Sequence, residues 1–319
     1  MSAAVKSQLS QFALEVAQGL SGPRQKKIPP RYFYDDLGSA LFEAITLLPE
    51  YGLTRADERI LSRYAGQISA KVGRVSVVAE LGSGNGKKTR QILNALSSKN
   101  TALVYHPIDV SCTALEICRR ELGDVCKIKT VCGDWVEGLD SIRRDRRRGD
   151  AMLLLFLGSS IGNVERECIT EFLQSLTVHL EPGDFFLLGA DLVKDIDAML
   201  AAYDDATGVT AAFNVNVLGR INRELGADFD LQSFAHEVRW NDQERRIEMH
   251  LRSCRHQSVY IDALKSVVHF SAGETIWTES SHKFTEQELT HYARASGFEP
   301  VATWTDREWP FVETLWRVI

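Results

Sequence analysis

Three glycines, Gly82, Gly84 and Gly86, stand between an apolar run and a segment with the composition of a helix. The apolar run from Val75 to Leu81 predicts a buried strand, and Lys87 to Leu96 predicts the helix that follows it. Glycines at such a junction let the backbone approach a ligand closely, because no Cβ atom stands in the way. The junction therefore favours a loop that binds a nucleotide-like cofactor.

The spacing of these glycines distinguishes three classes of cofactor. A phosphate-binding P-loop has the pattern GxxxxGKS or GxxxxGKT, but Leu81 stands five positions before Gly86, and a second lysine follows Lys87. A dinucleotide-binding loop has the pattern GxGxxG, with an acidic residue about 20 positions further on, whereas the spacing here is GxGxG. S-Adenosylmethionine has no pyrophosphate, so it needs no anion cradle and is compatible with this loop.

Two carboxylates follow the next two apolar runs. Thr101 to Ile108 leads into Asp109, whose two oxygens can accept hydrogen bonds from both ribose hydroxyls of an adenosine. Lys127 to Cys132 is followed by Asp134, which can accept from the adenine amine, and by Trp135, which can lie against the adenine ring. Carboxylates at the ends of consecutive strands favour S-adenosylmethionine over a nicotinamide cofactor, with a turn of no function as the weakest alternative.

Apolar runs and helical segments alternate over the middle of the chain. Such alternation predicts an α/β fold, in which a mostly parallel sheet has helices on both faces and binds ligands at the carboxyl ends of its strands. The glycine loop, Asp109 and Asp134 all fall at those ends. VATWTD and FVETLWRVI are expected to complete a seven-stranded sheet as a hairpin. The first five strands are expected near residues 75–81, 102–108, 127–132, 151–157 and 184–190.

Outside this region the pattern changes. Residues 2–20 are amphipathic at helical spacing, and Thr54 with Asp57 is typical of a helix start. Residues 193–230 predict helices, and three later segments of period two predict antiparallel strands. The apolar face of the first helix contains Val5, Leu9, Phe12, Val16 and Leu20, and the three segments are RRIEMHLRS, SVVHF and ETIWTESSHKF.

These changes of pattern predict two domains. We expect an α/β core made of residues 61–192 and 283–319, which binds the cofactor. We expect a second, α+β domain made of residues 1–60 and 193–282, which binds the substrate. A chain of 319 residues is long enough for such a division.

Composition and charge argue against several functions. Hydrophobic residues make up 44% and charged residues 25% of the chain, as in an ordinary globular protein. The net charge of −6 argues against a nucleic-acid partner, and the arginines between 143 and 148 predict a solvated loop before the fourth strand. We expect a cytoplasmic protein, because the chain has no apolar leader and no run long enough to span a bilayer. We also expect a monomer, because no stripe of exposed apolar residues stands out.

The cysteines give no sign of a metal centre. They form no CxxC pair, and none has a histidine at metal-ligand spacing. We therefore expect no metal and six reduced thiols, as is usual in the cytosol. The six are Cys112, Cys118, Cys126, Cys132, Cys168 and Cys254.

Several longer motifs carry a resemblance to one family. FYDDLGSALFEAIT, LGSGNGKKT, PIDVS, FLGSSIGN, AAYDDATGVTAAFN and TESxxKF together resemble the L-histidine Nα-methyltransferases of ergothioneine biosynthesis. LGSG occurs in many methyltransferases, whereas AAYDDATGVTAAFN and the Glu-x-Ser before Lys-Phe are specific to this family. The resemblance covers nearly the whole chain. The chain departs from the family pattern within the glycine loop and at Gly52, where a second tyrosine is common after Tyr51.

The resemblance implies a function and a set of residues. It implies a Rossmann-like class I methyltransferase core, a separate substrate domain, and the transfer of three methyl groups from S-adenosylmethionine to the α-amine of L-histidine. The products are hercynine and S-adenosylhomocysteine. By the resemblance, the cofactor is surrounded by Gly82, Gly84, Lys88, Asp109, Asp134 and Trp135. The amine and carboxylate of histidine are held by Tyr51, Asn163 and Tyr203, and its imidazole is received by Tyr34, Glu279 and Ser281, with Met249 bounding the ring.

The chemistry of these side chains agrees with the implied roles. Glu279 and Ser281 are two positions apart on a predicted strand, so both can reach the imidazole from one face. A polar slot of this kind rejects apolar ligands, because its buried groups would lose their partners. At the amine, Tyr51 and Asn163 are assigned a positioning role in catalysis, since a phenol with a reference pKa of about 10 is a poor base at neutral pH. Met249 is as compatible with core packing as with pocket lining.

Three alternatives remain open. The acceptor could be another amino acid, such as tryptophan or tyrosine, although a carboxylate such as Glu279 facing their rings would be costly. The same core could modify a nucleic acid or a protein, with the arginine run as an anchor, but the negative charge argues against this. The chain could also bind S-adenosylmethionine without catalysis.

Overall fold

The computed structural model describes residues 10–22, 25–147 and 149–319. The chain divides into two compact units. One, called here the α/β unit, consists of Gly52–Lys194 and His282–Ile319. The other, the α+β unit, consists of the segment that ends at Tyr51 together with Asp195–Ser281.

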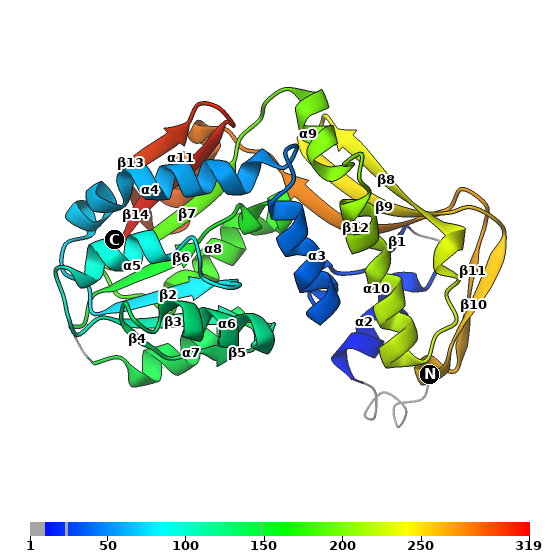
Figure 1. The fold of residues 1–319 in the computed structure, drawn as a ribbon, viewed down its shortest axis with the longest axis horizontal. Helices are drawn as coiled ribbons and strands as arrows, with labels where there is room; N and C mark the ends of the chain where they lie inside the picture. The colour runs from blue at the N-terminus through cyan, green and yellow to red at the C-terminus, as the bar shows by residue number, and fades with distance from the viewer. Residues whose placement is uncertain (1–9, 23–24, 148) are drawn as a thin grey trace. The chain divides into compact units, whose positions relative to one another are not determined.

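The α/β unit is built on the predicted sheet, in the order β13-β14-β7-β6-β2-β3-β4, with β5 also paired to β3 (Figure 1). The strands from β4 to β7 are parallel, whereas β14 runs antiparallel to β7 and forms a hairpin with β13. The expected Rossmann-like core is confirmed. Its third predicted strand is interrupted at residues 129–130, which gives eight strands where seven were expected: β2 Val77–Leu81, β3 Val104–Asp109, β4 Lys127–Ile128, β5 Val131–Cys132, β6 Met152–Phe156, β7 Phe185–Asp191, β13 Phe298–Asp306 and β14 Phe311–Val318.

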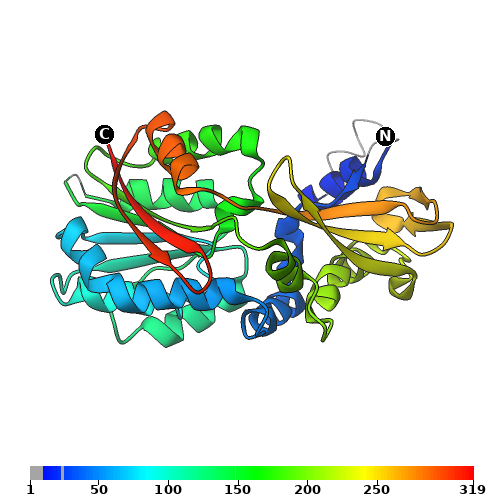
Figure 2. The same cartoon turned by 90° about the horizontal axis from the view of Figure 1, so that it is seen from above.

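Helices cover both faces of this sheet (Figure 2). The central strands β2 and β6 are buried at every position, as expected of parallel strands between two helical layers. Buried side chains from the sheet and the helices form one core around Phe156, Phe186 and Trp316. The helical elements are α4 Gly52–Val72, α5 Arg90–Ser97, α6 Cys112–Leu122, α7 Trp135–Asp145, α8 Ile169–Thr177 and α11 Glu286–Ala295, with short 3-10 turns at η2 Ser160–Asn163 and η3 Arg166–Cys168.

The beginning of α4 differs from the prediction. The helix begins at Gly52 rather than near Thr54, and it is continuous to Val72. The expected domain boundary at residue 60 falls inside this helix, so residues 52–60 belong to the α/β unit. Gly52 itself is packed against Trp309, because an added Cβ would lie 2.3 Å from the indole ring. A second tyrosine at this position would therefore clash with Trp309.

The arginine run also differs from the prediction of a solvated loop. Arg143 and Arg144 lie in the last turn of α7. Arg146 is buried and forms an ion pair with Asp184, with nitrogen–oxygen distances of 2.5 Å. Arg148 lies outside the described residues. Part of the run is thus structural, because the buried carboxylate of Asp184 needs a cationic partner.

The α+β unit contains a four-stranded sheet in the order β1-β12-β9-β8 and a separate hairpin of β10 and β11. The predicted helices after residue 193 and the strands β9, β11 and β12 are present, whereas β8 and β10 were not predicted. In α2, Phe12, Val16 and Leu20 form the buried face, and Val5 and Leu9 lie outside the described residues. The elements are α2 Gln11–Leu20, β1 Lys26–Lys27, η1 Pro30–Phe33, α3 Asp36–Thr46, α9 Ile196–Tyr203, α10 Val209–Leu225, η4 Leu231–Ser233, β8 Phe234–Asn241, β9 Arg246–Ser253, β10 Gln257–Ile261, η5 Asp262–Leu264, β11 Ser266–Phe270 and β12 Thr275–His282.

Candidate active site

The glycine loop leaves β2 with two glycines that face open space. Gly82 and Gly84 have φ angles of +66° and +54°, which favour glycine, and an added Cβ at either position would meet no atom within 4 Å. Gly86 has a different role, because its Cβ would lie 2.7 Å from both Cys118 and Leu122 on α6. Gly82 and Gly84 therefore leave backbone accessible to a ligand, whereas Gly86 permits close packing.

Asp109, the last residue of β3, is hydrogen-bonded directly to this loop. One carboxylate oxygen accepts a hydrogen bond from the Gly84 N–H at 2.8 Å, and the other accepts from the Ser111 N–H at 2.9 Å. Burial raises the pKa of Asp109, and these hydrogen bonds oppose the rise. A carboxylate has about four lone-pair sites, so both oxygens retain capacity for ribose hydroxyls. The fit to an adenosine is good.

Asp134 and Trp135 begin α7. Asp134 is the N-cap, and its carboxylate accepts from the Glu137 N–H at 3.0 Å. The half-buried ring of Trp135 packs edge-on against Phe156 and Phe172, with centroid distances of 5.0 and 5.5 Å. The helix cap thus fixes the carboxylate, and the two phenylalanines fix the indole. A role for both residues at the adenine ring remains a prediction.

A disulfide corrects the expectation of six reduced thiols. Cys112, the first residue of α6, is bonded to Cys132, the last residue of β5, and their Cα atoms are 5.3 Å apart. The two cysteines meet because β5 pairs with β3 immediately before α6 begins. Pairing of neighbouring parallel strands is a tertiary feature, so a spacing of 20 residues gave no signal in the sequence. The bridge joins the segments that carry Asp109 and Asp134.

Lys88 forms an ion pair that the sequence did not indicate. Its Nζ lies 2.7 Å from Oδ2 of Asp57, a fully buried residue of α4. The same oxygen accepts a hydrogen bond from the Gly158 N–H at 3.1 Å. Asp57 was interpreted as part of a helix start, but it links the glycine loop to the loop after β6. That second loop ends in η2, whose last residue is the half-buried Asn163.

Two further buried carboxylates lie near Lys88. Glu80 on β2 accepts hydrogen bonds from Thr89 at 2.7 Å and from the Tyr105 hydroxyl, and burial raises its pKa to about 7. Burial and the neighbouring Asp57 carboxylate raise the pKa of Glu313 on β14 well above its usual range. Both groups were missed, although a glutamate inside an apolar run such as VVAEL or FVETLW signals a buried carboxylate.

The candidate substrate residues of the α+β unit include three tyrosines that are linked by ring contacts through Phe42 and Tyr51. The rings of Tyr34 and Tyr51 pack edge-on against Phe42, with centroid distances of 5.6 and 6.4 Å. Tyr51 also packs edge-on against Tyr203 at 6.1 Å. Tyr51 and Tyr203 are each only 7% exposed. The structure therefore brings Tyr203 to two tyrosines that are far from it in the sequence.

Ser281 joins this group through a hydrogen bond. Its hydroxyl lies 2.7 Å from the Tyr203 hydroxyl, although the two residues are 78 positions apart. Glu279 is half-buried two positions earlier on β12. Met249 on β9 is buried with Ile247, and its carbonyl accepts from Thr278 of β12 at 2.9 Å. The strand pairing thus fixes the backbone that carries Glu279 and Ser281 beside that of Met249.

The backbone of Tyr203 is held by a second set of residues, His236 and Asn214. The His236 Nε2 lies 2.8 Å from the Tyr203 carbonyl, and the His236 Nδ1 lies 2.8 Å from the Asn214 amide nitrogen. An amide nitrogen can only donate, so Nδ1 accepts, and Nε2 carries the proton that is donated to Tyr203. Sequence reasoning missed both residues, because neither forms a motif with the tyrosine.

The family of the chain follows from comparison with known proteins. Residues 12–318 match the family described as histidine-specific, S-adenosylmethionine-dependent methyltransferases. This chain belongs to that family. The cofactor of this methyltransferase is therefore S-adenosylmethionine, as the glycine loop and Asp109 predict.

Two bacterial relatives match over most of their length. The histidine N-alpha-methyltransferase of Mycobacterium tuberculosis is 45% identical over 90% of this chain and 88% of that protein. The protein of the same name from Mycolicibacterium smegmatis is 44% identical over 92% of this chain and 90% of that protein. Ergothioneine biosynthesis protein 1 of Neurospora crassa is 31% identical over 89% of this chain, but only 32% of that longer protein is matched.

Two other kinds of feature are absent from the described residues of the methyltransferase. No described helix combines the length and the apolar character needed to cross a membrane. Nor do three or more His, Cys, Asp or Glu side chains come together as metal ligands within the described ranges.

Proposed function

We propose that this chain transfers three methyl groups in turn from S-adenosylmethionine to the α-amine of L-histidine, forming hercynine as the first step of ergothioneine biosynthesis. The observation that carries the proposal is the 45% identity to the M. tuberculosis histidine N-alpha-methyltransferase over 90% of this chain. The acceptor is a small molecule, and no nucleic acid takes part. The α/β unit binds the cofactor, and the α+β unit binds histidine.

In the α/β unit, the chain's own residues hold the nucleoside. When bound, S-adenosylmethionine supplies an electrophilic methyl group on its sulfonium sulfur. Gly82 and Gly84 give close backbone approach, Asp109 accepts from the ribose hydroxyls, and Asp134 accepts from the adenine amine. Trp135 lies against the adenine. The support for these roles is the open space at both glycines and the fixed orientation of Asp109 by two N–H groups.

At the amine, the problem is orientation of a lone pair. The amine of histidine must lose its proton and align with the methyl group before an in-line displacement can occur. Tyr51, Asn163 and Tyr203 orient the amine and carboxylate by neutral hydrogen bonds. None of them is a strong base, so positioning supplies more of the rate enhancement than proton abstraction does. The His236 contact to the Tyr203 carbonyl supports a rigid placement of that tyrosine.

At the imidazole, Glu279 accepts a ring N–H and Ser281 hydrogen-bonds the other ring nitrogen, with Tyr34 and Met249 bounding the ring. The Tyr203–Ser281 contact of 2.7 Å supports this assignment, because a hydroxyl already bonded on one side has a restricted orientation. An imidazole has two ring nitrogens, whereas an indole has one and a phenol has none, so neither of these rings can satisfy both Glu279 and Ser281 through ring nitrogens. Selectivity for histidine therefore comes from the penalty of leaving a buried carboxylate or hydroxyl unpaired.

The proposal is tested with purified protein, S-adenosylmethionine and each of the twenty amino acids in separate reactions. The products are identified by mass spectrometry, and we expect mono-, di- and trimethylated products from histidine alone. Trimethylation of tryptophan or tyrosine instead would show that the methyl acceptor is another amino acid. Cofactor binding in calorimetry without any product would favour a non-catalytic S-adenosylmethionine-binding protein. Light scattering tests the accompanying proposal that the enzyme acts as a monomer.

A further inference from the structure

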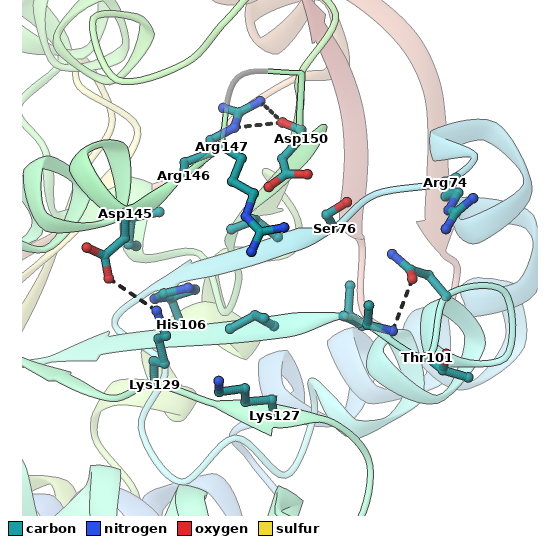
Figure 3. A pocket seen from close by; sticks show the side chains of 16 residues that line it. Arg74, Ser76, Thr101, His106, Lys127, Lys129, Asp145, Arg146, Arg147 and Asp150 are labelled. Atoms are coloured by element: carbon teal, nitrogen blue, oxygen red, sulfur yellow. Dashed lines mark hydrogen bonds and ion pairs between the residues drawn. The ribbon is translucent and has the colours of Figure 1, made fainter.

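A cavity of about 520 Å³ opens at the end of the α/β sheet where the parallel strands begin (Figure 3). Val104, the first residue of β3, lines the cavity, whereas Asp109 is the last residue of the same strand. The cavity is therefore at the opposite end of β3 from the cofactor carboxylate. Its size is within the range of about 300–1,000 Å³ that is usual for small-molecule sites.

The charged residues around this cavity are mostly cationic. Five lysine and arginine side chains line it, against only two carboxylates. One of the five, Arg146, is neutralised by the buried Asp184, which leaves an excess of two positive charges in a chain of net charge −6. The five cations are Arg74, Lys127, Lys129, Arg146 and Arg147, and the two carboxylates belong to Asp145 and Asp150. Such a local reversal of sign attracts anions.

Three of the cationic side chains are not paired with any described residue of the protein. Arg146 is paired with Asp184, and Lys129 lies 3.1 Å from the Asp145 carboxylate. The side chains of the remaining three form no ion pair or hydrogen bond with any residue in the described ranges, and these three are Arg74, Lys127 and Arg147. Guanidinium and ammonium groups together are the donors that proteins use to bind phosphate.

His106 adds a buried polar group to the same cavity. It lies on β3, is only 6% exposed, and forms no side-chain hydrogen bond within the described part of the chain. Burial and the nearby Lys129 lower the pKa of His106 to about 4, so the ring is neutral at physiological pH and offers one donor and one acceptor. Because His106 lines the cavity, a ligand there can use the donor and the acceptor of its ring.

The cavity also has an apolar wall. The wall is formed by Val77 of β2, Leu103 immediately before β3, Val104 of β3 and Ile142 of α7. An apolar wall gains nothing from an inorganic ion, but it can cover the carbon skeleton of an organic ligand. The cavity thus combines phosphate donors with space for an organic group.

We propose that this cavity binds the phosphate ester of a sugar or nucleoside. Arg74, Lys127 and Arg147 neutralise the phosphate, and His106 hydrogen-bonds the ester. The site is separate from the histidine and S-adenosylmethionine sites, and the proposal does not depend on the proposed function.

The test is isothermal titration calorimetry with ribose 5-phosphate and uridine 5′-monophosphate on the full chain saturated with S-adenosylhomocysteine. Saturation keeps either ester from the cofactor site, and an ester without adenine reduces competition further. We expect one site per chain with a Kd of about 0.1–1 mM, equivalent to about 4–5.5 kcal/mol. The Kd is expected to rise with salt, because the attraction is largely between charges near the surface.

The decisive variant is the double charge reversal Lys127→Glu with Arg147→Glu, which exchanges two exposed side chains and is expected to fold. It should weaken ester binding at least tenfold. Arg294→Glu on α11 is the control for charge reversal outside the cavity, since it reverses one exposed arginine of the same unit and should leave the Kd unchanged. His106→Phe, which keeps a ring but removes both nitrogens, should weaken binding severalfold.

Three results would overturn the proposal. One is the absence of measurable binding of either ester to the wild-type protein. Another is an affinity for inorganic phosphate equal to the affinity for the two esters, which would show that the organic group is not recognised. The third is equal binding by the double variant and by Arg294→Glu, which would place the ester elsewhere on the surface.

Discussion

The buried pair of Asp57 and Lys88 offers the sharpest test of how the site is assembled. Asp57 is fully buried, and one of its oxygens serves both the Lys88 ammonium at 2.7 Å and the Gly158 N–H at 3.1 Å. Replacing Asp57 by alanine leaves both donors without their acceptor. The two donors belong to the glycine loop and to the loop that leads to Asn163, so the change should disturb both loops.

The size of the effect follows from the burial of the pair. Removing one partner of a buried ion pair costs about 3–5 kcal/mol. The Lys88 side chain is 26% exposed and can be partly hydrated, so we take the lower end, about 3 kcal/mol. For a unit of this size, each kcal/mol lowers Tm by about 2–4 °C. Asp57→Ala should therefore melt roughly 6–12 °C below wild type.

A double-mutant cycle separates the pair from other effects of the change. Thermal unfolding is measured for Asp57→Ala, Lys88→Met and the double variant, and the double variant should be more stable than the sum of the two losses predicts. Asp57→Asn keeps an acceptor for the Gly158 N–H and should lose less. S-Adenosylhomocysteine affinity, measured by calorimetry, should fall in Asp57→Ala. Additive losses, or a loss below about 1 kcal/mol, would refute the reasoning, because a buried ion pair must be coupled.

The remaining predictions concern the cofactor, the imidazole, the disulfide and pH. Asp109→Ala should weaken S-adenosylhomocysteine binding about 100-fold, from the loss of two charged hydrogen bonds of about 1.5 kcal/mol each, while calorimetry shows unchanged histidine binding; an unchanged cofactor affinity would contradict its role. Glu279→Ala should weaken histidine binding far more than cofactor binding, and equal losses in the two titrations would argue against the assigned contact. Cys112→Ser should lower unfolding stability by about 3 kcal/mol, from the closure entropy of a loop of about 20 residues, and wild type in reductant should then match the variant; a variant that is still destabilised by reductant would speak against the bridge. Glu80 has a pKa of about 7 in the folded protein, above its ordinary value of 4.5. Its contribution to stability is therefore fully present below pH 4.5, where the carboxyl is protonated, and it is lost as the pH rises through 7. Denaturant unfolding from pH 4.5 to 8 should show a loss of about 3 kcal/mol from this group in wild type that is absent in Glu80→Gln, and parallel pH profiles for the two proteins would refute it.

The sequence by itself determined the α/β core and the cofactor loop. Apolar runs of strand length separated by helical segments predict which backbone is buried, and the glycines and Asp109 stand where the chain must turn at the carboxyl ends of those strands. These are local properties, because they depend only on residue type and spacing along one segment. The family motifs are likewise contiguous stretches, so the activity could be inferred before any contact was known.

Only the tertiary structure decided which distant side chains meet. Tyr203 and Ser281 are 78 residues apart, Asp57 and Lys88 are 31 apart, and neither pair forms a motif. The same holds for the cations that line the cavity at the opposite end of β3, which come from several separate segments. The pairing of the elements that carry them depends on strand order, register and helix packing, and none of these is encoded in the periodicity of a single segment.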